Sequence, residues 1–220
     1  MKMPKVSFCV GSLLVLFAVR LCGQGQGVVN FSNVGAPPDK RIYYVHMSHT
    51  QPGVVEQGPT LLSGSNYRIA LYGGPQGLPE SALVQIGPAA TFLTGPQAGT
   101  FSGGNRTISG FGAGPTLSVQ ARAWSQISGV PDSYEAVLAA MAVGDSRAIG
   151  GKGPLFDFKS KDPGNPQEVA IPIGDAAGWQ GFCVDADFNF LGCVIPEPST
   201  VALTLFGALV LFSLSRLRKS

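Results

Sequence analysis

The chain has 220 residues, of which 30 are glycine, 17 are proline and 13% are charged. Glycine and proline at this density, spread without a three-residue period, exclude a collagen triple helix and argue against long helices. The formal net charge of +2 belongs to the two ends, because residues 26–195 hold nine basic and twelve acidic side chains, a net charge of −3. That balance argues against a nucleic-acid binder, which needs clustered Lys and Arg.

A secretory signal peptide is predicted over residues 1–23, with cleavage near residues 23–25. Lys2 and Lys5 supply its positive start, and an uncharged apolar run of the right length follows. Two alternatives stay open. Lipidation at Cys22 would need small residues before it, which are absent. An uncleaved anchor would need about 20 apolar residues, more than the run provides.

Short β-type runs separated by Gly and Pro turns fill residues 26–195, which we predict to be one domain. Strands are expected over residues 28–31, 41–47, 67–72, 83–86, 107–111, 116–124, 155–158, 168–173 and 181–184. Residues 116–124 alternate apolar and polar side chains, which predicts a strand with one buried and one solvated face. Many short strands with such turns predict an all-β fold, an antiparallel β-sandwich of the jelly-roll type.

One short helix is predicted to interrupt these strands, across one end of the sandwich. Residues 133–142 are rich in Ala, Leu and Met, and Asp132 stands three residues before Glu135, the spacing of a capping box. We expect residues 144–153, which follow the helix, to form a loop.

Two of the four cysteines, Cys183 and Cys193, fall inside the predicted domain. An even pair in an exported chain favours a disulfide. Its loop of about 11 residues would stabilise the fold by roughly 2–3 kcal/mol in the chain-entropy model. The alternative is two reduced thiols at adjacent strand ends. A zinc site is not expected, because partner ligands are lacking nearby.

The last segment, residues 196–220, carries three features in a fixed order. It begins with a Pro-Glu-Pro motif, formed by Pro196, Glu197 and Pro198. The prolines hold this motif extended. Residues 200–217 then form an apolar stretch that, as a transmembrane helix, would cover about 27 Å. The segment closes with a basic stop, formed by Arg216, Arg218 and Lys219.

This order, in a chain with a signal peptide, resembles the PEP-CTERM sorting signal. The resemblance implies an exosortase, a membrane-embedded cysteine-type transpeptidase of Gram-negative bacteria, as partner, and delivery to the cell surface or extracellular matrix after Sec export. Basic residues stay in the cytoplasm, so the tail would first hold the domain on the periplasmic side of the inner membrane. A plain tail anchor is the alternative, and the sequence does not decide whether the tail is cut or exchanged. The stretches GVVNFSN, YRIALYGGP and VQARAW also resemble PEP-CTERM proteins of Verrucomicrobia-like bacteria, which lack an assigned activity.

No metal site, cofactor or catalytic set is predicted. The two histidines, His46 and His49, would point to opposite faces of a strand. Asp185, Asp187 and Asn189 match the start of a calcium loop, but the glycine and the glutamate required further on are missing.

These patterns favour a non-enzymatic surface or extracellular-matrix protein. The alternative is a carbohydrate-binding, lectin-like module associated with exopolysaccharide, with Trp179 in a Gly-rich stretch as the candidate for stacking on a sugar ring. A third hypothesis, an exported polysaccharide hydrolase, requires two carboxylates paired across a cleft.

Overall fold

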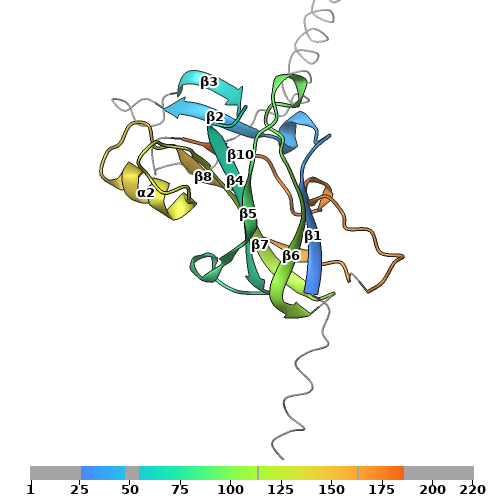
Figure 1. The fold of residues 1–220 in the computed structure, drawn as a ribbon. Coiled ribbons are helices and arrows are strands. Elements are labelled where there is room, and N and C mark those ends of the chain that lie inside the picture. The colour runs from blue at the N-terminus through green and yellow to red at the C-terminus, as the bar shows by residue number, and fades with distance from the viewer. Residues whose placement is uncertain (1–25, 48–54, 113, 163, 186–220) are drawn as a thin grey trace, which may run out of the picture.

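A computed structural model describes residues 26–47, 55–112, 114–162 and 164–185 (Figure 1). The predicted signal peptide and sorting tail lie outside these residues. Within the described residues, the strands are β1 (Gln26–Ser32), β2 (Ile42–Met47), β3 (Val55–Leu61), β4 (Tyr67–Pro75), β5 (Val84–Thr91), β6 (Ser102–Gly112), β7 (Thr116–Ser125), β8 (Gly150–Lys152), β9 (Phe156–Lys159) and β10 (Phe182–Val184). The α-helix is α2 (Tyr134–Ala142), and 3-10 turns are η1 (Pro38–Lys40), η2 (Glu80–Ala82), η3 (Gly95–Gln97) and η4 (Ile173–Asp175).

The largest sheet is antiparallel and has the order β5-β4-β7-β8, with β9 also paired to β7. The strands β8 and β9 follow one another along the same edge of β7, because β8 pairs with residues 122–124 and β9 with residues 116–119. Residues 144–153 were expected to form a loop, and this prediction is wrong for the three residues of β8. Two of these residues, Gly150 and Gly151, have no side chain, so no alternation of apolar and polar residues indicates a strand.

Two smaller sheets complete the mostly-β fold. β1 and β6 form an antiparallel pair, and the third sheet has the order β10-β2-β3. β2 and β3 are antiparallel, but β10 runs parallel to β2. The predicted mostly-β class with antiparallel sheets is confirmed. The strands form sheets of two, three and five members.

The main hydrophobic core lies between the central sheet and the two smaller ones. Its completely buried residues include Val29 and Phe31 of β1, Ile42 of β2, Ile69 of β4, Val119 of β7 and Val184 of β10. Each such side chain contributes about 1.5–3 kcal/mol by leaving water.

A second cluster lies on the other face of the central sheet, and Figure 1 shows α2 and the β1–β6 pair on opposite sides of that sheet. There α2 packs Tyr134 and Val137 against Trp124 of β7. Both faces of β7 are therefore buried, and the prediction of one solvated face is wrong. The helix prediction is correct to within one residue, although Ser133 is the N-cap rather than Asp132: its Oγ accepts the Ala136 N–H at 3.2 Å.

Two predicted elements differ from the structure in other ways. Residues 168–173 were expected to form a strand, but Pro172 makes only an isolated bridge to Asn30 before η4 begins. β3 was not expected, because Gly58 and Pro59 interrupt its sequence pattern; its place at a sheet edge tolerates the proline. Among the described residues, no helix has the length and apolar character needed to span a membrane.

Candidate functional site

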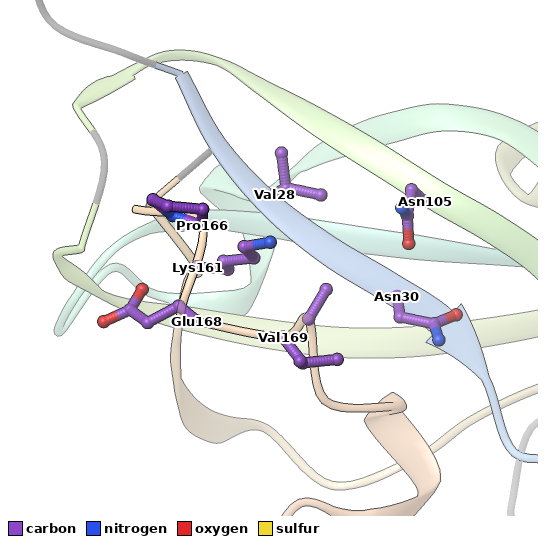
Figure 2. Close-up of a pocket in the computed structure, with 8 residues that line it drawn as sticks. Val28, Asn30, Asn105, Lys161, Pro166, Glu168 and Val169 are labelled. Atoms are coloured by element: carbon purple, nitrogen blue, oxygen red, sulfur yellow. The ribbon is translucent and has the colours of Figure 1, made fainter. Parts of the chain in front are cut away.

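A pocket of about 460 Å³ opens where Lys161 and residues 164–170 lie beside the outer face of β1 (Figure 2). Its volume falls within the range of about 300–1,000 Å³ that is typical of small-ligand sites. The lining residues are Val28, Asn30, Asn105, Lys161, Pro166, Glu168, Val169 and Ala170.

The floor of the pocket comes from the alternation of side chains along β1. Val29 and Phe31 are completely buried in the core, so Val28 and Asn30, which alternate with them, point outward. Asn105 of β6 lies directly opposite Asn30 in the antiparallel register, and its side chain therefore shares the same outer face.

The wall of the pocket, formed by Lys161, Pro166 and residues 168–170, is held by hydrogen bonds. Val28 N donates to Lys161 O at 3.0 Å, and Lys161 N donates to Val28 O at 2.9 Å. Further along, Asp162 N donates to the Glu168 carboxylate at 2.9 Å, which closes the segment on itself. The wall is thus held both to β1 and by its own contacts.

The polar groups of this pocket are available to a ligand. Among the described residues, none makes a hydrogen bond or ion pair with Lys161 Nζ or with the side-chain amides of Asn30 and Asn105. Figure 2 shows the Lys161 ammonium and the Glu168 carboxylate pointing in opposite directions. The pocket therefore offers one ammonium, one carboxylate and two amides. Because the ammonium and the carboxylate point apart, this set suits binding rather than proton transfer.

A second group of polar side chains surrounds Arg122, which is 8% exposed on β7. Its guanidinium donates to Gln120 Oε1 at 2.9 Å, to Glu80 O at 2.9 Å and to Glu135 Oε1 at 3.3 Å. It also lies 4.1 Å from the centre of the Tyr72 ring. These contacts leave no direction open to a ligand, so we interpret this group as structural.

The environment of Arg122 also shifts the pKa values of its neighbours. Partial burial would raise the pKa of Glu80, but hydrogen bonds from Lys152 and Gln120 hold it below its ordinary value. Burial raises the pKa of Tyr134 to about 12. Both shifts follow from packing and pairing, and neither gives a group poised near neutral pH for acid–base catalysis.

The prediction that Trp179 stacks on sugars is wrong. The residue is 2% exposed, and its Nε1 donates to Lys40 O at 3.0 Å. Its ring packs against Phe101 and Phe156, with centroid distances of 5.9 and 6.4 Å. No face of this ring is open to a ligand. A lone tryptophan between glycines carries no periodic pattern from which its burial could be read.

Of the other predicted site residues, only Cys183 lies within the described part of the chain. Cys183 is disulfide-bonded. Its predicted partner, Cys193, lies outside the described residues. The sorting motif and the basic stop also lie outside them: Pro196, Glu197, Pro198, Arg216, Arg218 and Lys219.

The described residues contain no group of three or more His, Cys, Asp or Glu that could hold a metal ion. His46 lies in β2 and Asp185 directly follows β10. His49, Asp187 and Asn189, the other residues weighed as metal ligands, lie outside the described part of the chain.

The sequence analysis did not identify Asn30 and Lys161 as site residues. The signal for Asn30 is its place between Val29 and Phe31, which predicts an outward side chain on a strand. No comparable local signal exists for Lys161, because its position depends on pairing with Val28, far away in the sequence.

Comparisons with known proteins add no relative: no protein-family model matches the chain, and no curated protein or solved structure shows significant similarity. The function must therefore be argued from the residues themselves.

Proposed function

We propose that this chain is an exported protein of the cell surface or extracellular matrix, sorted by a PEP-CTERM tail and processed by an exosortase. The observation that carries the proposal is the order of the Pro-Glu-Pro motif, the apolar stretch and the basic stop within residues 196–220. In this proposal the Sec machinery exports the chain, and residues 200–217 form a membrane helix that holds the domain on the periplasmic side until processing.

The disulfide of Cys183 supports export. Structural disulfides persist in oxidising compartments such as the periplasm and the cell exterior, and are rare in the cytosol. Cys183 is also 4% exposed and lies in β10, within the folded domain.

We propose a non-enzymatic role for this domain, with its strands arranged as a sandwich. The pocket offers a single carboxylate, Glu168, which accepts a hydrogen bond from the backbone of its own segment. Polysaccharide hydrolysis needs two carboxylates facing each other across the sugar. The free amides and ammonium of the pocket suit recognition instead.

Cell fractionation tests export. With an antibody to the folded domain, we expect the protein in the outer-membrane and medium fractions, and its loss when intact cells are treated with protease. The variant Pro196→Ala/Glu197→Ala/Pro198→Ala should instead accumulate at the inner membrane, while the control Ser199→Ala sorts normally. A protein found only in the cytoplasm would contradict the proposal.

A second candidate function, carbohydrate binding, is favoured by the pocket rather than by Trp179. The Asn30 and Asn105 amides offer donors and acceptors for hydroxyl groups, and Val169, 81% exposed, offers apolar surface beside them. Binding of the purified full chain to a glycan array tests this candidate, and Asn105→Ala should reduce the signal. A domain that retains no glycan would exclude it.

A further inference from the structure

We propose that the pocket binds a carboxylate-bearing sugar unit, a uronate of an acidic polysaccharide, and that Lys161 selects for its negative charge. This inference rests on the carbohydrate-binding function proposed above and deepens it.

The backbone of Lys161 is fixed in place, and none of the described residues neutralises its charge. Both backbone hydrogen bonds with Val28 hold its Cα against β1, at 3.0 and 2.9 Å. Its ammonium meets no carboxylate among the described residues. The nearest candidate in the lining, Glu168, points away in Figure 2 and accepts the Asp162 N–H instead. An anionic ligand would supply the missing partner.

The neighbouring amides argue for a sugar rather than a simple anion. An inorganic anion has only acceptor atoms, whereas the amides of Asn30 and Asn105 also present carbonyl oxygens that need donors. Sugar hydroxyls both donate and accept. The paired positions of these two residues across β1 and β6 place both amides on one face, so one ring can reach both.

The apolar part of the lining fits the C–H face of a sugar ring. Val28 on the floor and Val169 on the wall lie on two sides of the pocket in Figure 2. The volume of about 460 Å³ exceeds what a small inorganic anion fills and lies within the range of organic-ligand sites. A ring with a carboxylate on one side and hydroxyls on the other therefore matches the pocket better than a neutral ring.

The ammonium of Lys161 acts as a compact charge with three donors, and charge-assisted hydrogen bonds are about twice as strong as neutral ones. The pocket is open to solvent, so the ion pair should weaken as salt is added. Tighter binding of acidic ligands and weaker binding at high salt would therefore indicate an ion pair with Lys161, because binding through the amides alone has neither property.

The test uses the full chain in a nonionic detergent and an array of galacturonate, glucuronate and mannuronate oligomers. Each oligomer is matched by its neutral counterpart, in which the carboxylates are reduced to hydroxymethyl groups. The best ligand is then titrated by calorimetry against Lys161→Gln, Lys161→Arg and the control Lys159→Gln. Lys159 is an exposed lysine on β9, outside the pocket lining.

We expect the acidic oligomer to bind at least about tenfold more tightly than its neutral counterpart. Lys161→Gln should remove this preference, whereas Lys161→Arg should keep affinity within about threefold because the charge remains. Lys159→Gln should bind like the unaltered chain. The Lys161 side chain has no role in the fold, so circular dichroism and thermal melting should not change.

Two outcomes would overturn the inference, and they differ in what else they affect. Equal binding of neutral and acidic oligomers, or a Lys161→Gln variant that keeps the preference, would leave carbohydrate binding standing and refute charge selection. Failure of every oligomer to bind would refute both the inference and the carbohydrate-binding function.

Discussion

The two faces of the central sheet are both buried, but by different means. On one face, Leu117, Val119 and Ala121 of β7 join the main apolar core. On the other, Ser118, Gln120 and Arg122 alternate with them and are 2%, 1% and 8% exposed. The first face is covered by strands, whereas α2 and the segments beside it cover the second.

The polar face remains buried because its groups are satisfied. Ser118 Oγ donates to Asp157 at 3.0 Å, and Gln120 Nε2 donates to Gly153 O at 3.0 Å. Arg122 adds three hydrogen bonds and its contact with the Tyr72 ring, a cation–π pair worth about 0.5–2 kcal/mol. Alternation in a sequence therefore shows which side chains share a face, but not whether that face meets water.

The apolar face should be the most sensitive to truncation. Phe101→Ala removes a completely buried ring whose centroid lies 4.5 Å from that of Phe31 and 5.9 Å from that of Trp179. We expect the free energy of unfolding to fall by about 3–5 kcal/mol, as for other buried aromatic residues. Urea denaturation measures it. The control Val84→Ala, at a position 62% exposed, should change it by less than about 0.5 kcal/mol. A similar small loss for Phe101→Ala would contradict the packing described for this face.

The polar face should be less sensitive. Arg122→Met keeps the packing of the side-chain stem but removes the donors to Gln120, Glu80 and Glu135. We expect a loss of about 1–3 kcal/mol, mainly from the buried Gln120 oxygen left without its donor. The Glu135 side chain is 59% exposed and regains water.

A matched control separates burial from charge in this second experiment. Arg147→Met removes an arginine that pairs with Asp145 at 2.7 Å, but its side chain is 63% exposed. The loss should be well below that of Arg122→Met, because an exposed ion pair contributes little to stability. A gain in stability for Arg122→Met would show instead that the buried network is a net burden, as some buried ion pairs are.

The helix that covers the polar face depends on its cap. Ser133→Ala removes the acceptor for the Ala136 N–H, with an expected loss of about 1 kcal/mol. Ser128→Ala, in the exposed turn before the helix, is the control. Urea denaturation of the two variants measures the difference, and equal stabilities would mean that the cap contributes nothing.

The smallest expected effect is a loss of stability at alkaline pH. Burial raises the pKa of Tyr134 from near 10 to about 12, so the folded chain keeps a proton that the unfolded chain loses. This contribution is complete below pH 10 and is lost as the pH rises through 12. The Tyr134→Phe substitution removes the ionisable hydroxyl. The fall in the free energy of unfolding between pH 9 and pH 11 should therefore be smaller in this variant, by about 1 kcal/mol or less. An unchanged slope would contradict the burial assigned to this hydroxyl.

Elements with strong local patterns could be predicted from the sequence, and those defined by distant contacts could not. β4, β7 and α2 follow from their own residues. The strand position of Gly151 could not be predicted from its neighbours in the sequence, because a distant contact requires the glycine. A Cβ at Gly151 would collide with the Cys183 carbonyl oxygen and with Val184 in β10. The candidate site shows the same limit. The outward orientation of Asn30 could be predicted from the residues on either side of it in β1, whereas Lys161 reaches the pocket only through its pairing with Val28.

We propose above that this domain is exported and that its sorting tail is processed. Mass spectrometry of the protein from native cells tests it most directly, because it reads both mature termini in one measurement. We predict an N-terminus near residues 23–26 and a C-terminus near residues 196–200. A protein that retains Met1 and ends at an intact Ser220 would contradict the account.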